Sequence, residues 1–252
     1  MQEFLNNALN HGLYDTIDSY EEEMVEEIGK LVAIPSLPTY VTEEGMNHGP
    51  EIKRCLRYAL ELSERLGFRT HNENDNYGWA EVGEEGPLLS IFVHLDVVPV
   101  GDGWTREPFC MSREGDLLYG RGTIDNKGPA VSVLYALKSC CDMGVKWPCR
   151  VRIWFGTNEE TGMKDAKMYV EKYGYPDYAF VPDSQFPLSY SELGGSRFVL
   201  RKNFDWKKIS SDIKLCSFEY EKHVNGISKY CECELECSDE SLAEETAKKL
   251  HE

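Results

Sequence analysis

The chain has 252 residues, a hydrophobic fraction of 41% and a formal net charge of -17. This length fits one large domain, or a domain with a second one begun beside it, and the composition supports a sizeable buried core. The negative charge argues against nucleic acid and anionic membrane surfaces as partners, because both require a positive protein surface.

Targeting signals and disulfide frameworks are not visible. Residues 1–15 contain no basic region followed by an apolar run, as a signal peptide would. No apolar run approaches the ~20 residues that a membrane span needs. The nine cysteines have no framework spacing and are typical of reduced thiols. We therefore expect a cytoplasmic protein; its oligomeric state is open.

The first predicted elements are two helices and a strand. Residues 20–34 carry apolar side chains at helical spacing on one face and glutamates on the other, and Pro35 ends this helix. A second helix is predicted over about residues 49–66, with Gly67 as a suitable residue at its end. The run 79–82 is typical of a strand.

The next strand ends at His94, with Asp96 two residues later. Side chains at i and i+2 leave the same face of an extended chain, so the pair suits a metal ligand with a supporting carboxylate. The alternative is a surface histidine and aspartate where a strand frays into a turn. Alone, this short pattern predicts a site weakly.

A long loop, residues 101–118, precedes Asp125, and residues 127–143 are predicted to form a helix. The loop is either a plain connection or a substrate-side loop, since long ordered loops are often functional. Asp125 lies near the start of the helix, where a carboxylate is favourable as a simple cap. On its own, the cap is the better explanation.

Two further carboxylate positions follow apolar runs. The predicted strand 151–157 leads into the adjacent pair Glu159-Glu160, and the strand 178–182 leads into Asp183. Adjacent glutamates are more often a solvated pair than a site. After a buried strand, however, one can bind a metal ion while its neighbour acts as a general base.

Taken together, these positions predict an α/β fold with a mostly parallel central sheet flanked by helices. Short apolar runs rich in Val, Ile and Phe are typical of buried parallel strands. Functional groups collect where such strands end. Histidine, aspartate and glutamate at several strand ends offer ligands for zinc or a similar divalent ion. Four weak signals at matching positions favour a metal-dependent hydrolase over a charged surface.

Four segments carry a family resemblance: HLDVVPVGDGW (94–104), YGRGTIDNKGP (119–129), GTNEETG (156–162) and PDSQFP (182–187). In this order and spacing they resemble the motifs of the co-catalytic zinc exopeptidase and deacylase family, which includes aminoacylases and carnosinases. The details are most similar to its PepV-type bacterial dipeptidases. The resemblance covers roughly residues 20 to 195.

The resemblance implies a role for each residue. His94 and Asp183 would bind one metal ion, Glu160 the other, and Asp125 both. Asp96 would support the His94 imidazole, and Glu159 would act as the general base. These roles make Asp96 and Glu159 the catalytic residues. The resemblance also implies two divalent ions, with zinc favoured and manganese possible, and a cis peptide bond between Asp125 and Asn126.

One departure from the family pattern sets the expected domain organisation. Family members carry a further ligating histidine late in the chain, after an inserted lid domain, and this sequence stops at Glu252 before that return. His223 and His251 match neither that ligand nor the lid histidine of the family. We therefore expect 1–194 to be the amino-terminal part of a catalytic domain and 195–252 the beginning of a lid, with negligible activity for this chain alone.

The tail is predicted to contain strands at 197–200, 213–220 and 230–237, followed by a helix over 238–250, as suits an α+β lid. In the third strand Cys231, Cys233, Leu235 and Cys237 share one face. A cysteine metal site lacks paired spacing there, so a core face is the better interpretation.

Three functions remain open from sequence. The first is a metallo-dipeptidase, or close deacylase, acting on a small peptide or N-acyl amino acid. The second is a non-catalytic metal-binding or regulatory fragment of the same fold. The third is an interaction module with an acidic surface, which has no need of Glu159 beside Glu160. The preferred substrate and native metal are not readable from the residues.

Overall fold

The computed structural model describes residues 12–41, 46–184, 189–191, 212–220 and 231–251. The chain divides into two compact units, Met1–Ser189 and Tyr190–Glu252. The predicted strand at 197–200 and residue 194, where the expected first domain ends, lie outside the described residues. Within the described part of the chain, no helix is both long and apolar enough to cross a membrane.

The first unit is an α/β unit, which confirms the predicted fold class. Its helices are α2 (Gly12–Asp18), α3 (Glu21–Val32), α4 (Pro50–Arg65), α5 (Lys127–Asp142), the 3-10 helix η1 (Glu159–Thr161) and α6 (Lys164–Tyr173). Its strands are β1 (Tyr40–Val41), β2 (Asn47–His48), β3 (Arg69–Glu73), β4 (Tyr77–Val82), β5 (Leu88–His94), β6 (Ser112–Glu114), β7 (Leu117–Tyr119), β8 (Arg150–Gly156) and β9 (Tyr178–Phe180).

Five of these strands form one mixed sheet in the order β3-β4-β8-β5-β9. Strand β4 runs antiparallel to β3 and β8, whereas β5 runs parallel to both β8 and β9. In this register Ile91 of β5 lies beside Ile153 of β8 and Phe180 of β9. The carboxyl ends of three neighbouring strands therefore meet at the same edge of the sheet.

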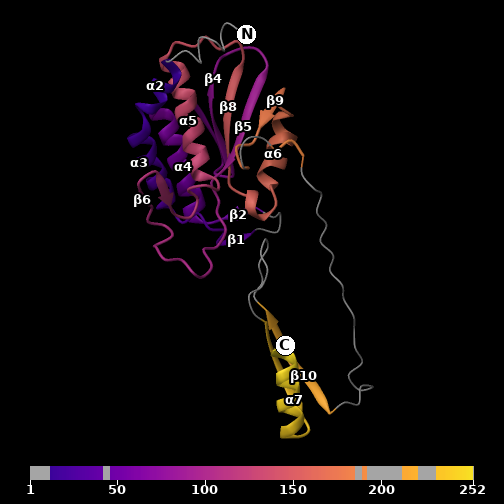
Figure 1. Cartoon of the computed structure of the whole chain (residues 1–252). Helices are drawn as coiled ribbons and strands as arrows, with labels where there is room; N and C mark the ends of the chain where they lie inside the picture. The colour runs from indigo at the N-terminus through magenta and orange to yellow at the C-terminus, as the bar shows by residue number, and fades with distance from the viewer. Residues whose placement is uncertain (1–11, 42–45, 185–188, 192–211, 221–230, 252) are drawn as a thin grey trace. The chain divides into compact units, whose positions relative to one another are not determined.

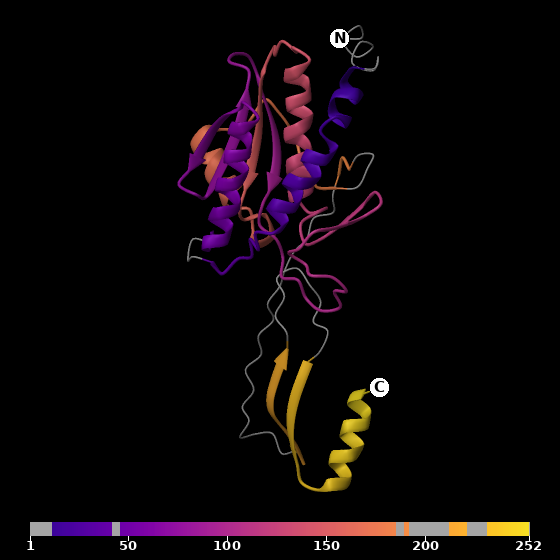
Figure 2. The ribbon, with the colours of Figure 1, turned by 90° about the vertical axis from the view of Figure 1, so that its left-hand side faces the viewer.

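Each face of the sheet packs against its own helices (Figure 1). One face packs on α3, α4 and α5 through a large aliphatic core that includes Leu56, Ile91 and Leu134. The other face packs on α6 through an aromatic cluster of Tyr77, Trp79, Trp154 and Tyr169. Figure 2 views the first unit from the side of the three helices. Residues that alternate along each strand thus serve two separate cores.

The second unit contains the antiparallel pair β10 (Ile213–Tyr220) and β11 (Cys231–Cys237), followed by α7 (Glu240–His251). These bounds agree with the predicted strands and helix. Cys233, Leu235 and Cys237 are half-buried, as expected for a shared face, but Cys231 is exposed. All nine cysteines are free thiols.

Candidate metal centre

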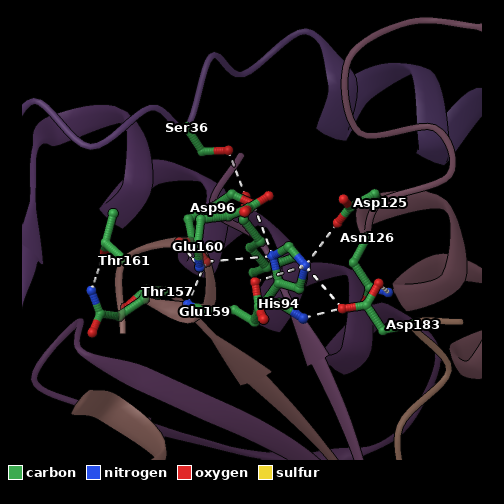
Figure 3. A network of polar contacts seen from close by, with 12 residues as sticks. Ser36, His94, Asp96, Asp125, Asn126, Thr157, Glu159, Glu160, Thr161 and Asp183 are labelled. Atoms are coloured by element: carbon green, nitrogen blue, oxygen red, sulfur yellow. Dashed lines mark hydrogen bonds and ion pairs between the residues drawn. The ribbon is translucent and has the colours of Figure 1, made fainter. Parts of the chain in front are cut away.

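His94 ends strand β5 with its side chain only 4% exposed. Its Nδ1 lies 2.9 Å from the backbone carbonyl oxygen of Asp96. A carbonyl oxygen only accepts hydrogen bonds, so Nδ1 carries the proton and donates it. This contact orients the imidazole and leaves Nε2 as the nitrogen that faces the strand-end edge (Figure 3).

Carboxylates converge on His94 Nε2. Asp125 Oδ1 lies at 2.9 Å, Asp183 Oδ2 at 3.3 Å and Glu159 Oε2 at 3.9 Å. Two overlapping groups have ligand atoms close enough to share an ion: His94 with Glu159 and Asp183, and His94 with Asp125 and Glu160. The structure therefore brings together all the residues that the sequence singled out as ligands.

The donor set fits a divalent ion. Nε2 is buried and makes no hydrogen bond of good geometry, although carboxylate oxygens surround it. A buried polar atom without a hydrogen bond is costly, and an ion coordinated by one imidazole and several carboxylates would satisfy it. Nitrogen and oxygen ligands of this kind suit zinc or manganese.

The site opens towards solvent away from the histidine. The Asp125 side chain is 54% exposed, that of Glu159 34% and that of Asp183 23%, against 4% for His94. The site at the edge of the sheet therefore has a buried nitrogen on one side and carboxylates that are partly exposed to solvent on the other.

Burial and the neighbouring charges shift the pKa values of several groups in the site. Burial raises the pKa of Glu160 to about 7, with the Asp125 charge adding to the shift. Burial also raises the pKa of Glu159. Burial lowers the pKa of His94, but the neighbouring carboxylates of Asp125, Asp183 and Asp96 outweigh it, so the net pKa is raised. The concentrated negative charge attracts a cation.

Asp96 acts mainly on the backbone. Its carboxylate is fully buried and accepts hydrogen bonds from the amides of Glu159 and Glu160, each at 3.2 Å. Its Oδ1 lies 3.5 Å from His94 Nδ1, farther than its own carbonyl oxygen at 2.9 Å. The sequence predicted support of the imidazole by Asp96, and the structure adds a link from this residue to the glutamate pair.

Asn126 is a site residue that sequence reasoning missed. Its side-chain amide donates to the carbonyl oxygen of Pro182 and to Asp183 Oδ1, both at 2.9 Å. Its Oδ1 accepts from the His94 amide at 3.3 Å. The bond between Asp125 and Asn126 is cis, as the resemblance implied. The only signal in the sequence is a polar residue directly after a candidate ligand.

The comparisons with known proteins agree on one family. The model of the family described as Peptidase family M20/M25/M40 matches residues 91–232. A Staphylococcus aureus (strain bovine RF122 / ET3-1) protein named "Putative dipeptidase" is 32% identical over 223 residues, which cover 88% of this chain and 48% of that protein. The chain thus spans about half the length of the curated relatives it matches.

Two solved structures have a similar fold. Human carnosine dipeptidase 1 aligns with a TM-score of 0.59 and 25% identity, over 68% of this chain and 40% of that chain. An M20 family metallo-carboxypeptidase from Sulfolobus solfataricus aligns with a TM-score of 0.55 and 26% identity, over 64% of this chain and 37% of that chain. In both cases the similarity covers less than half of the other protein.

Proposed function

The chain belongs to peptidase family M20/M25/M40, and from this membership we propose that it carries the metal site of a hydrolase that cleaves the amide bond of dipeptides or N-acyl amino acids. The observation that carries the proposal is His94 Nε2, buried without a hydrogen bond and faced by carboxylates from the ends of neighbouring strands. The names of the relatives and of the human neighbour support a dipeptide substrate.

The proposed ligands are His94, Asp125, Glu160 and Asp183. When bound, divalent ions at these residues would polarise the scissile carbonyl and lower the pKa of a water molecule. The Asp96 carbonyl keeps the proton of His94 on Nδ1, so that Nε2 can bind a cation. Asn126 holds Asp183 in place through its side-chain amide.

Glu159 is the proposed general base. Its Oε2 would take a proton from the attacking water and then deliver it to the leaving amine. Burial raises the pKa of this carboxyl in the metal-free chain, which is the direction that suits a general base. Asp96 fixes the Glu159 backbone through the amide hydrogen bond. Glu159 also lies beside His94 and Asp183, so its side chain can reach a water molecule among the ligands.

We also propose the domain roles: 1–194 as part of the catalytic domain and 195–252 as the beginning of a lid. The division of the chain after Ser189 supports this proposal. The free cysteines support a reducing compartment such as the cytoplasm.

Zinc titration by calorimetry tests the metal site. Both ligand groups use His94, and its Nδ1 is engaged with Asp96, so one nitrogen must serve either group. We expect one tight ion per chain and a second bound weakly by oxygen ligands alone, because carboxylates without imidazole hold zinc poorly. His94→Ala should abolish the tight event, whereas His71→Ala, distant from the site in sequence and on β3, should leave it unchanged. Two equally tight events would contradict this arrangement.

Hydrolysis of a dipeptide by the zinc-loaded, full-length protein tests the reaction. Cleavage that disappears in Glu159→Gln supports the proposed enzyme. Zinc binding without cleavage in the full-length protein would instead favour a non-catalytic metal-binding role. A protein that neither binds a divalent ion nor cleaves peptides would contradict both.

A further inference from the structure

Besides that of Asp96, a second buried carboxylate binds the backbone next to the glutamate pair. Asp165 is the second residue of α6 and is only 1% exposed. Its Oδ2 accepts the amide of Thr157 at 2.6 Å and that of Asn158 at 3.1 Å. Its Oδ1 accepts the amide of Ala166 at 2.8 Å. None of these atoms takes part in the proposed reaction.

Asp165 and Asp96 divide a run of four backbone amides between them. Asp165 accepts the first two, and Asp96 accepts those of Glu159 and Glu160. The two aspartates come from different elements, α6 and the segment after β5. Four successive N–H groups thus point at buried carboxylates, which fixes the path of the backbone from the end of β8 into η1.

Capping of α6 does not account for this arrangement. An aspartate in the first turn of a helix commonly accepts a nearby helical amide, as Asp165 Oδ1 does. Oδ2, however, makes both of its hydrogen bonds outside the helix, to the segment that leads to the glutamates. Burial raises the pKa of Asp165 to about 6 despite the amide hydrogen bonds that lower it. A helix cap alone does not require so costly a burial.

The strand end is shaped around the same carboxylate. A Cβ on Gly156 would lie 3.0 Å from Asp165 Oδ2 and 2.7 Å from the ring of Trp154. The last residue of β8 therefore leaves room for the carboxylate to reach the following amides. The Asn158 side chain closes the turn, since its Nδ2 donates to Thr161 Oγ1 at 2.6 Å and its Oδ1 accepts from the Lys164 amide at 2.8 Å.

We propose that Asp165 is a positioning residue for the metal site: by holding the amides of Thr157 and Asn158 it sets the backbone from which Glu159 and Glu160 reach the ions. The effect of Asp165 on metal binding rests on the proposed function. Its effect on the backbone at Thr157 and Asn158 applies to the metal-free chain as well. The role is indirect, because the Asp165 carboxylate accepts hydrogen bonds from backbone amides of residues other than the candidate ligands.

Amide hydrogen exchange of the metal-free, full chain tests the backbone part. In Asp165→Ala the amides of Thr157 and Asn158 should exchange about 10- to 100-fold faster, as expected when hydrogen bonds to a buried charged group are lost. Tyr169→Phe is the matched control, since Tyr169 lies on the same helix as Asp165 and loses only the hydroxyl that accepts a hydrogen bond from Arg152 of β8. The control should not change exchange at these two amides.

Zinc titration of the same variants tests the metal part. Asp165→Ala should weaken the tight binding event about 10- to 100-fold, the usual effect of removing a group that orients ligands. Tyr169→Phe should bind zinc like the wild type. Asp165→Asn keeps one oxygen for the two amides, so amide exchange and zinc affinity should lie between those of the wild type and the alanine variant. It replaces the alanine variant if that variant does not fold.

The outcomes separate this inference from the proposed function. Faster exchange at both amides together with weaker zinc binding supports it. Loss of thermal stability with unchanged exchange and zinc affinity overturns it and leaves Asp165 as a helix cap. If the wild-type chain binds no zinc, the proposed function fails. The exchange data on the metal-free chain still decide whether Asp165 holds the loop, and unchanged exchange there overturns the inference.

Discussion

At the scale of single residues, the two adjacent glutamates belong to different candidate ligand groups. Glu159 belongs to the candidate ligand group with His94 and Asp183, whereas Glu160 belongs to the group with His94 and Asp125. Their amides are fixed by the same buried carboxylate, Asp96. The backbone of the pair is therefore held in common, and the difference between the two must come from their side chains.

Replacing each glutamate by glutamine should separate their roles. Glu160→Gln removes a proposed ligand, so zinc content after dialysis should fall. Glu159→Gln should keep its zinc and lower hydrolysis by the full-length protein by about 10²- to 10⁴-fold, the usual contribution of a general base. Glu171→Gln, an exposed position on α6, is the control. If metal analysis gave the reverse pattern, the assignments of the two residues would be exchanged.

The sequence predicts ligands better than the residues that hold them. His94, Asp125, Glu160 and Asp183 each follow a recognisable apolar run or precede a helix, and the structure brings them together. Asn126 and Asp165 act through hydrogen bonds to backbone groups that are distant in the chain or belong to another element. No periodicity or spacing reports such contacts, because they depend on how the elements pack.

At the scale of elements, a buried lysine joins α5 to the end of α3. Lys127 is fully buried, and its Nζ donates to the carbonyl oxygens of Leu31 at 3.0 Å and Ile34 at 2.6 Å. Burial lowers its pKa, with Cys55 and Asp96 opposing the shift. A cation at the carboxyl end of a helix interacts favourably with the helix dipole.

Lys127→Met should keep the buried volume and remove two hydrogen bonds from a cation, while each carbonyl oxygen keeps one backbone donor, the amide of Ile34 for Leu31 and that of Ser36 for Ile34. We expect a loss of about 1–3 kcal/mol in the free energy of unfolding, the usual worth of hydrogen bonds from a charged group, partly offset by removal of a buried charge. Urea denaturation measures it. Ser132→Ala, on the same helix, should change stability by about 0.5 kcal/mol or less. An equal effect of the two substitutions would show that the link does not stabilise the fold.

A second link joins β3 to α6 through Glu73. Its carboxylate accepts hydrogen bonds from Lys172 at 2.8 Å and from Tyr173 at 2.7 Å, and His71 Nε2 lies at 3.1 Å. The hydrogen bonds from Lys172, then those from Tyr173 and His71, lower the pKa of Glu73 to about 2. The folded state therefore favours the ionised form more than the unfolded chain does.

This difference in pKa predicts a pH dependence. Because the pKa in the folded state lies below the unfolded value of 4.5, the contribution of Glu73 is present above pH 4.5 and is lost as pH falls towards 2. Glu73→Gln should lower the urea midpoint at pH 6, and the gap from wild type should close between pH 4.5 and 2. Glu171→Gln should run parallel to the wild type throughout. A gap that stays constant with pH would mean that Glu73 acts by packing alone.

Buried elements could be predicted from the sequence more readily than exposed ones. Helices α3, α4 and α5 and strands β5 and β8 follow from apolar periodicity, since each packs on the aliphatic core. Strand β3 was not predicted, because its residues RTHNE are charged or polar and only partly buried. Its place at the edge of the sheet comes from antiparallel pairing with β4, which the sequence pattern alone does not reveal.

At the scale of the whole molecule, sequence reasoning reaches the α/β class and the edge where the candidate site lies, but not the strand order. The antiparallel insertion of β4 beside β8 makes the sheet mixed, and no motif marks it. The two compact units also differ in the candidate metal ligands that they contain. Unit Met1–Ser189 contains every candidate ligand, and the described part of Tyr190–Glu252 contributes to neither ligand group.

Zinc should therefore protect one unit and not the other. An ion that binds only the folded state stabilises it by about 2.7 kcal/mol at a hundredfold excess over Kd. Because the ligands come from the ends of β5, β8 and β9 and the start of α5, we expect this gain as slower hydrogen exchange in the peptides of those elements. Peptides from β10, β11 and α7 should exchange at the same rate with and without zinc. In His94→Ala the zinc protection of β5, β8, β9 and the start of α5 should disappear. Equal zinc protection of β10 and β11 would show that ion binding couples the two units, and the ligand set would then have to extend beyond the first.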